Sequence, residues 1–313
     1  MHLGIDVGGT NLKAGLVDDQ GKLVQVCRTP LNFCGAEAFV DALGELALRT
    51  VRESGVDPAS VETVGMGIPG AVSEGRIIYT SNIPLQDVPV EKWFRRYLDV
   101  PVFLGNDADC AAVGEYFHGA GRGSRDFVVV TLGTGVGGGL VIGGKLQTGM
   151  GMGGEVGHMV IVHDGELCNC GRKGCWERYA SATALIRLTK EAMEQHPDSR
   201  MHAVAAELGG VDGRTSFTAA EQGDPAALDV CSRYVSYLAA GVTNLVNMLQ
   251  PEKLALGGGV ADAPAALLLD PLRRTVAEEC IGRHAGVYTE IVKAELGNDA
   301  GIIGAAMLHR AVR

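Results

Sequence analysis

Hydrophobic residues near the start of the chain fall into three short runs separated by turn-forming residues. The runs span residues 3–7, 11–17 and 22–28, with Gly8-Gly9-Thr10 and Asp18-Asp19-Gln20-Gly21 between them. This spacing predicts three strands joined by two tight turns. From residue 36 to residue 52 the apolar positions recur at helical spacing, which predicts a helix after the third strand.

The same order of elements recurs near the middle of the chain. Residues 127–132 and 136–142 are apolar runs on either side of Gly133-Thr134-Gly135, and a second glycine turn leads into Lys145-Leu146. We interpret the repeat as an internal duplication of an α/β unit, although glycine-rich hairpins are also common by themselves. We therefore predict an N-terminal α/β domain over residues 1–118 and a larger one over 119–298. A helix from about residue 299 to 313 is expected to pack back on the first domain.

Composition narrows the class of function. The chain has 45 glycines in 313 residues, about twice the usual share, which favours tight turns and backbone lying close to a ligand. A net charge of −10 argues against a nucleic-acid or anionic-membrane surface. Only 5% of the residues are aromatic, so platforms for stacking single-stranded bases are scarce. A small-molecule substrate fits this chain best.

One uncharged stretch raises the question of a membrane segment. Residues 127–144 are uncharged but contain seven glycines, and each costs a helix about 1 kcal/mol relative to alanine. This stretch is therefore not expected to span a membrane. No basic segment followed by an apolar run is visible near the start, so we expect a cytoplasmic protein in which at least some of the cysteines bind metal, rather than a secreted protein held by disulfides.

Two glycine-threonine turns are candidates for phosphate binding. Backbone amides in such turns can approach phosphate oxygens, and Asp6, just before Gly8-Gly9-Thr10, could hold Mg²⁺. Ordinary hairpin turns would have the same sequence. The second turn contains G-x-G-x-x-G, but a strand rather than a helix is predicted after it, which argues against a Rossmann fingerprint.

Asn106 and Asp107 follow an apolar run at residues 100–104. The carboxyl ends of strands bind ligands in open α/β sheets, and a carboxylate there can accept the proton of a substrate hydroxyl. Asn106 can bind sugar hydroxyls as donor and acceptor. Capping of the following helix is the alternative reason for such a pair.

A histidine and three cysteines have the spacing of a metal site. His158, Cys168, Cys170 and Cys175 form the pattern H-x9-C-x-C-x4-C, a closed Cys3His set that suits structural Zn²⁺. Glu155 and Glu177 flank this loop, and an ordered loop would present both carboxylates to sugar hydroxyls. Both phosphate turns lie outside the loop in sequence, so we expect the metal to serve the sugar site more than the nucleotide. The other five cysteines are interpreted as core thiols.

Together these motifs resemble the ROK family (repressors, open reading frames and sugar kinases), and within it the chain is most similar to bacterial zinc-containing glucokinases. The resemblance covers essentially the whole chain. The matching stretches are residues 6–10, 105–109, 132–139, 153–158, 168–177, 256–259 and 297–301.

The resemblance implies a duplicated two-domain actin/hexokinase-like (ribonuclease H-like) fold with an interdomain cleft. It implies ATP-dependent phosphorylation of a sugar 6-hydroxyl with Mg²⁺, structural Zn²⁺ and a homodimer. Asp107 takes the position of the general base. The implied sugar contacts are Gly70, Asn82, Asn106, Asp107, Glu155, His158 and Glu177, and the implied nucleotide contacts are Asp6, Gly8, Gly9, Thr10, Lys13, Gly133, Thr134, Gly135 and Gly258.

Several alternatives remain open at this stage. Glucose is the expected sugar, but N-acetylglucosamine, N-acetylmannosamine, mannose and allose fit the same motifs, because discrimination depends on pocket shape. A sugar-binding regulator without turnover is a more remote reading. Repressors of the family carry an N-terminal helix-turn-helix, whereas a strand is already predicted here from Leu3, so we expect a kinase.

Overall fold

The computed structural model describes residues 1–80 and 83–311, and the chain divides into two compact units. The first contains Met1–Val129, Gly139–Gly154 and Glu295–Arg313, and the second contains Val130–Gly138 and Glu155–Ala294. Among the described residues, no helix combines the length and the apolar composition needed to cross a membrane.

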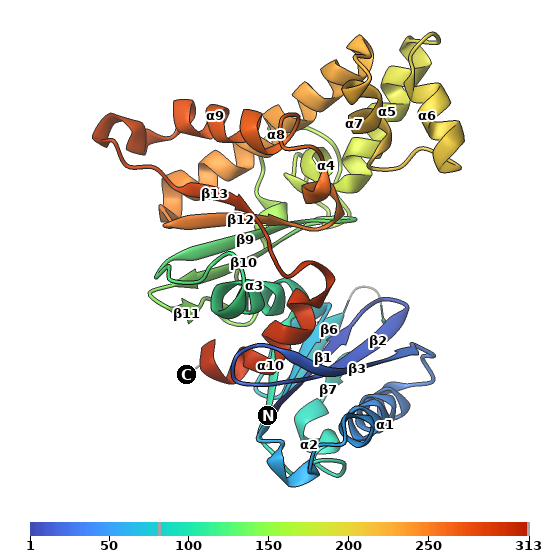
Figure 1. Cartoon of the computed structure of the whole chain (residues 1–313), viewed down its shortest axis with the longest axis vertical. Helices are drawn as coiled ribbons and strands as arrows, with labels where there is room; N and C mark the ends of the chain where they lie inside the picture. The colour runs from blue at the N-terminus through green and yellow to red at the C-terminus, as the bar shows by residue number, and fades with distance from the viewer. Residues whose placement is uncertain (81–82, 312–313) are drawn as a thin grey trace. The chain divides into compact units, whose positions relative to one another are not determined.

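The first unit is built on a five-stranded sheet with the strand order β3-β2-β1-β4-β8, of which β1, β2 and β3 are labelled in Figure 1. The two predicted turns join antiparallel strands, and β4 and β8 continue the sheet in parallel with β1. Every residue of β4 is buried, as expected for a central strand covered on both faces. The strands are β1 His2–Val7, β2 Asn11–Val17, β3 Leu23–Pro30, β4 Thr63–Ile68 and β8 Val102–Asn106.

Helices cover this sheet through residues that the hydrophobic pattern predicts. α1 (Ala36–Ser54) buries Phe39, Leu43 and Leu46 on one face and ends at Gly55, whose φ of 70° suits glycine. Two short helices of the unit are α2 (Val90–Phe94) and α3 (Asp107–His118). A small antiparallel sheet, which the sequence analysis does not predict, contains β5 (Gly70–Ser73), β6 (Arg76–Thr80) and β7 (Gln86–Val88).

The C-terminal helix α10 (Ala300–Ala311) packs against β1, β4 and α3 at backbone contact distance. Glycines make this possible: a Cβ atom on Gly65 would lie 1.7 Å from the carbonyl oxygen of Ala305, and one on Gly304 would lie 1.6 Å from that of Cys110. Any side chain at these positions would force the helix away from the sheet.

A second five-stranded sheet has the order β11-β10-β9-β12-β13. It repeats the order of the first sheet: three strands in hairpin sequence, then two later strands, of which β12 and β13 are parallel. This correspondence agrees with the predicted duplication. The strands are β9 Phe127–Leu132, β10 Val136–Ile142, β11 Lys145–Leu146, β12 Lys253–Gly257 and β13 Glu290–Lys293.

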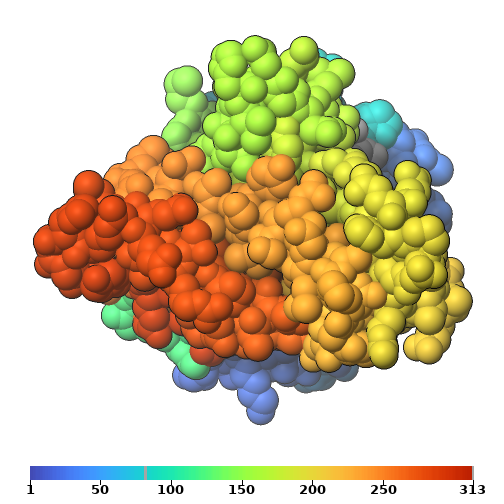
Figure 2. Space-filling model, turned by 90° about the horizontal axis from the view of Figure 1, so that it is seen from above, coloured from blue at the N-terminus to red at the C-terminus, as the bar shows by residue number. Residues whose placement is uncertain are grey.

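The second unit is otherwise mostly helical. Its longest helix, α8, is capped by Asp224, whose Oδ1 accepts a hydrogen bond from the amide of Ala227 at 2.8 Å, and Pro225 follows at the first helical position. Figure 2 shows one face of this unit, where orange and red segments that include α8 and α9 lie beside yellow segments that include α6. The helices are α4 Glu177–Ala180, α5 Ala182–Gln195, α6 Met201–Leu208, α7 Thr215–Glu221, α8 Pro225–Leu249 and α9 Leu269–Glu279.

Candidate active-site residues and metal centre

The turn between β1 and β2 contains the first predicted phosphate-binding residues. The Gly8 amide donates to the carbonyl of Asn11 at 2.9 Å, which closes the turn, and the Thr10 carbonyl accepts from Leu31 at 2.9 Å. Gly9 and Thr10 are exposed. The turn therefore presents backbone amides and the Thr10 hydroxyl to solvent, an arrangement that can bind phosphate oxygens.

Asp6 and Lys13 face each other across this hairpin. Their side chains form an ion pair of 3.6 Å between Oδ2 and Nζ. Burial raises the pKa of the Asp6 carboxyl group above its ordinary value, and the positive charge of Lys13 offsets part of that rise. A Cβ atom on Gly301, at the start of α10, would lie 3.3 Å from the Asp6 carboxyl carbon. A partly buried carboxylate of this kind fits the oxygen ligands that Mg²⁺ prefers.

Asn106 and Asp107 join the end of β8 to the start of α3. The Asn106 Oδ1 atom accepts from the amide of Ala108 at 2.8 Å, so the helix-capping role is confirmed. Its Nδ2 atom donates to the carbonyl of Gly70 at 3.2 Å, which brings two predicted sugar-contact residues together. Asp107 is exposed in the first turn of the helix, where the positive end of the helix dipole stabilises its charge. Asn82 lies outside the described residues.

The turn between β9 and β10 contains the second set of predicted phosphate-binding residues. β10 begins at Val136, so a strand follows the glycines and the rejection of a Rossmann fingerprint is confirmed. Gly258, after β12, has a φ of 83°, and a Cβ atom there would lie 2.4 Å from the carbonyl oxygen of Leu132. The structure thus brings Gly258 close to the end of β9, next to Gly133.

The start of α5 supports this second turn, which the sequence analysis misses. The amide of Ala182 donates to the carbonyl of Gly133 at 2.8 Å, and the Thr183 hydroxyl donates to the carbonyl of Thr134 at 2.8 Å. The only sequence signal is Ser181, a favourable cap whose Oγ accepts from the amide of Ala184 at 3.1 Å. That signal predicts where the helix begins but not what it contacts.

The four predicted metal ligands lie together. The ligand atoms of His158, Cys168, Cys170 and Cys175 are all within 4.8 Å of one another. The Cys170 and Cys175 sulfurs are 3.6 Å apart, and His158 Nδ1 lies 3.7 Å from Cys168 Sγ. Two sulfurs on one tetrahedral Zn²⁺ would be about 3.8 Å apart. The donor set and its spacing therefore fit a tetrahedral metal ion.

Glu177 links this cluster to the second turn. Its Oε1 atom accepts from the Cys168 thiol at 2.9 Å. Burial and this hydrogen bond raise the pKa of Cys168 to about 12, a rise that a bound cation would oppose. A Cβ atom on Gly135 would lie 2.7 Å from Glu177 Oε2. Glu155 is exposed, and its carbonyl accepts from the His158 amide at 3.1 Å.

One cysteine assignment needs correction. Cys27, Cys110, Cys231 and Cys280 are buried, as predicted for core thiols, but Cys34 is exposed. It lies in the irregular segment between β3 and α1, where the chain has no element to cover it.

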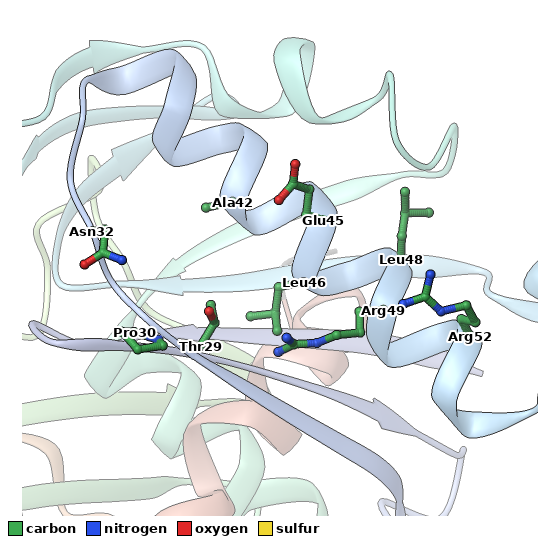
Figure 3. A pocket seen from close by; sticks show the side chains of 9 residues that line it. All are labelled: Thr29, Pro30, Asn32, Ala42, Glu45, Leu46, Leu48, Arg49 and Arg52. Atoms are coloured by element: carbon green, nitrogen blue, oxygen red, sulfur yellow. The ribbon is translucent and has the colours of Figure 1, made fainter.

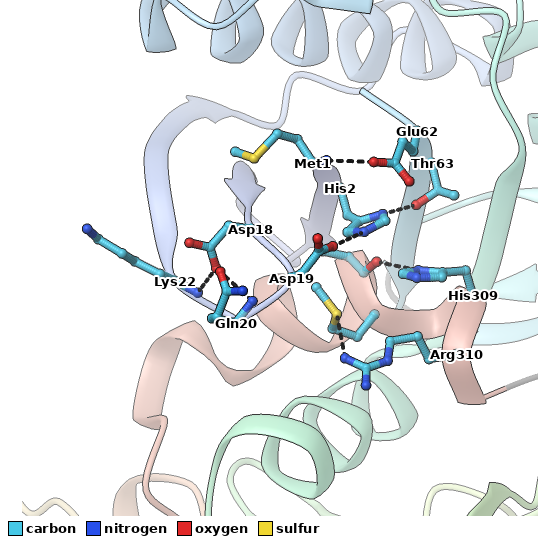
Figure 4. Close-up of polar contacts among 12 residues, drawn as sticks. Met1, His2, Asp18, Asp19, Gln20, Lys22, Glu62, Thr63, His309 and Arg310 are labelled. Carbon is cyan, nitrogen blue, oxygen red and sulfur yellow. Dashed lines mark hydrogen bonds and ion pairs between the residues drawn. The ribbon is translucent and has the colours of Figure 1, made fainter. Parts of the chain in front are cut away.

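Two other features contain none of the predicted site residues. A pocket of about 480 Å³ lies between the end of β3 and α1, and the side chain of Arg49 reaches toward the strand (Figure 3), donating to the Arg28 carbonyl at 2.8 Å. The buried His2 ring contacts Thr63 at 2.8 Å and Asp19 at 3.0 Å and stacks on His309 (Figure 4). Each of these features belongs to the packing of the first unit.

Comparison with known proteins places these motifs in one family. The model of the ROK family matches residues 2–312. The chain is 36% identical over 316 aligned residues to a glucokinase of Streptomyces coelicolor, covering 99% of this chain and 98% of that protein. It is also 32% identical to an N-acetylmannosamine kinase of Escherichia coli, with 98% and 97% coverage.

The likeness extends to three dimensions. The crystal structure of a ROK family glucokinase from Streptomyces griseus in complex with glucose and AMPPNP superposes with a TM-score of 0.81 at 37% identity, covering 98% of each chain. The expected actin/hexokinase-like α/β fold is thereby confirmed. The chain belongs to the ROK family and is related over its whole length to sugar kinases.

Proposed function

We propose that this protein is an ATP-dependent glucokinase that phosphorylates the 6-hydroxyl of D-glucose. The position of Asp107 carries the proposal, because its exposed carboxylate lies in the first turn of α3 beside Asn106, which caps the helix. Similarity to the Streptomyces glucokinases along nearly the full chain supports the choice of sugar.

In this proposal Asp107 accepts the proton of the sugar 6-hydroxyl. The hydroxyl oxygen then forms a bond to the γ-phosphorus of ATP, the bond to the bridging oxygen breaks, and ADP leaves with the electron pair. Asn106, Glu155, His158 and Glu177 bind sugar hydroxyls, with Gly70 beside Asn106. These residues hold the acceptor in place, and such positioning, together with electrostatic stabilisation, accounts for most of the catalysis of phosphoryl transfer by proteins.

The glycine turns hold the nucleotide. Gly9 and Thr10 in the first unit, and Thr134 and Gly135 in the second, offer amides and hydroxyls to phosphate oxygens, while Gly8 and Gly133 close the two turns with their own amides and let the backbone approach the phosphates. Lys13 supplies a positive charge near Asp6, and Asp6 would hold Mg²⁺, directly or through water. When bound, Mg²⁺ would neutralise part of the negative charge of the phosphates. Gly258 lies close to the second turn and completes its glycine-lined surface.

The Cys3His cluster would hold a structural Zn²⁺. All four protein ligands are present and no open position remains for a catalytic water. Because the Nδ1 atom of His158 faces the sulfurs, its other ring nitrogen is the one that can bind a sugar hydroxyl. We also propose a homodimer, which sedimentation at micromolar concentration can test; a monomer would contradict it.

Substitution of Asp107 tests the proposed base. Asp107→Asn keeps the shape but removes the proton acceptor, so kcat should fall at least about 10²-fold. Asp99→Asn, the same change at another exposed aspartate, is the control and should leave kcat unchanged. Both variants should melt like the wild type. Near-normal turnover in a folded Asp107→Asn protein would remove Asp107 as the base.

A second candidate keeps the chemistry and changes the sugar. The relationship to an N-acetylmannosamine kinase makes an acetamido sugar the leading alternative, followed by mannose and allose. A coupled assay of ADP release over hexoses and N-acetylhexosamines, compared by kcat/KM, decides between them. Preference for an acetamido sugar would overturn glucose, and no sugar-dependent ADP release would favour a regulator.

A further inference from the structure

The β9–β10 turn is fixed to α5 by two consecutive carbonyl groups. The Gly133 carbonyl accepts from the backbone amide of Ala182, and the Thr134 carbonyl accepts from the side chain of Thr183, each at 2.8 Å. The first bond survives any substitution at position 183. The second depends entirely on the Thr183 hydroxyl.

These carbonyls determine where the next amides point. In a planar trans peptide the N–H of one residue is antiparallel to the C=O of the residue before it. Holding the Thr134 carbonyl toward α5 therefore directs the Gly135 amide away from the helix. Holding the Gly133 carbonyl directs the Thr134 amide the same way. An anion-binding turn requires such amides to be aligned before the ligand arrives.

The start of α5 is rigid enough to act as a support. Ser181 caps the helix through Oγ at 3.1 Å from the Ala184 amide, and its carbonyl accepts from the Leu185 amide at 3.0 Å. Ala184 and Leu185 are buried in the second unit, whereas Thr183 is exposed. Thr183 can thus be changed without disturbing the core.

We propose that Thr183 is a positioning residue that aligns the Gly133–Gly135 turn for the phosphates of the nucleotide. This inference rests on the proposed function of that turn. It predicts that loss of the hydroxyl weakens nucleotide binding and leaves sugar binding unchanged, because only the Gly135 amide loses its support while the bond from Ala182 to the Gly133 carbonyl remains.

Three variants on α5 separate this role from general stability. Thr183→Val removes the hydroxyl at nearly constant shape, and Thr183→Ser restores it. Thr189→Val removes a buried hydroxyl of the same helix that donates only to the Leu185 carbonyl at 2.8 Å, and is the matched control.

The first measurement uses the full chain without ligands. Hydrogen–deuterium exchange in peptides that cover residues 130–138 should be faster in Thr183→Val than in the wild type, Thr183→Ser or Thr189→Val. A residue that only touched the bound nucleotide would not change this exchange. Unchanged exchange in Thr183→Val would overturn the inference.

The second measurement is steady-state kinetics. In Thr183→Val the KM for ATP should rise about two- to tenfold, the loss expected for one hydrogen bond, while the KM for sugar stays constant and Thr183→Ser recovers the wild-type value. Faster exchange with an unchanged KM for ATP would overturn the role in nucleotide binding but leave the kinase proposal intact. A wild type that consumes no ATP with any sugar would contradict the kinase proposal itself.

Discussion

The two glycine-threonine turns look alike in sequence but are supported in different ways. The Gly8–Thr10 turn is held by its own hairpin and by the Leu31 amide, and an ion pair between Asp6 and Lys13 lies just behind it. The Gly133–Gly135 turn is also closed by a hydrogen bond of its own, from the Gly133 amide to the Gly135 carbonyl at 3.0 Å, but it is held in addition from outside, by the start of α5 and by Glu177 beside Gly135. The first turn therefore lies next to an ion pair, whereas the position of the second turn also depends on contacts with α5 and Glu177.

Two turns of similar sequence can therefore respond to different changes in the rest of the protein. The first turn should respond to pH and to charge at Asp6, because a partly buried carboxylate lies at its base. The second should respond to the order of the metal loop, because Glu177 contacts both Cys168 and the space beside Gly135. That the metal serves the sugar site more than the nucleotide stays a prediction, and the position of Glu177 is the route by which the metal loop would also affect the second turn.

Loss of a metal ligand should have the largest effect and should separate the two turns. Cys170→Ser should disorder residues 158–177, weaken sugar binding at least about tenfold, and raise hydrogen exchange in residues 133–135 through Glu177. Exchange in residues 8–10 should not change. Cys34→Ser, an exposed cysteine outside the cluster, is the control.

Calorimetry measures the affinities of these proteins for glucose and for a non-hydrolysable ATP analogue. Retained glucose affinity in zinc-free protein would show that the metal does not order the sugar residues. If hydrogen exchange in residues 133–135 were the same with and without metal, Glu177 would not connect the metal loop to the second turn.

Alanine substitution in the turns should have the next largest effect. Gly258→Ala, beside the second turn, places a methyl group 2.4 Å from the backbone carbonyl oxygen of Leu132 at a φ of 83°, an overpacking that should lower the free energy of unfolding by about 1–3 kcal/mol. A Cβ atom on Gly133 or Gly9 would meet nothing within 4 Å, so these variants should stay within about 0.5 kcal/mol of wild type. Urea unfolding measures the free energy of unfolding of all three variants. An equal decrease in Gly9→Ala would contradict the predicted difference between the two turns.

The smallest expected effect concerns pH. Because burial raises the pKa of Asp6 in the folded chain, its contribution to stability is fully present below the ordinary aspartate pKa of about 3.9 and is lost as the pH rises through the folded value. Asp6→Asn should therefore raise Tm at pH 7 to 8, and the gain should vanish near pH 3. Its kinase activity should fall, because Asp6 would hold Mg²⁺.

Melting curves across pH provide the check on Asp6. Thr134→Val, at the second turn, is the comparison and should show the same difference from wild type at every pH. A lower Tm for Asp6→Asn at neutral pH would mean that the ion pair with Lys13 outweighs burial.

Much of the fold follows from local patterns in the sequence. The hairpins of both sheets, the strand after Gly135 and the cap at Asn106 were predictable because each depends on neighbours a few residues away. The Cys3His set was predictable because three of its ligands lie close together in the chain. Confirmation of these elements says nothing about the metal itself, which stays a proposal.

What sequence reasoning missed depends on distant contacts. Thr183 meets the Thr134 carbonyl across 49 positions, and the contact of Glu177 with Gly135 has no local signature. The sheet of β5, β6 and β7 was missed because its strands are short and partly polar. The segment with Cys34 has no apolar period, so its exposure could not be read from composition.

The close seating of α10 has a consequence for biosynthesis. β1 and β4 are translated well before α10, the helix whose backbone lies against their glycines. Until α10 is translated, Gly4 and Gly65 lack the backbone that lies against them in the folded chain. The packing of the first sheet is therefore completed only after the second unit has been translated, and nascent chains should depend on protection until α10 is available.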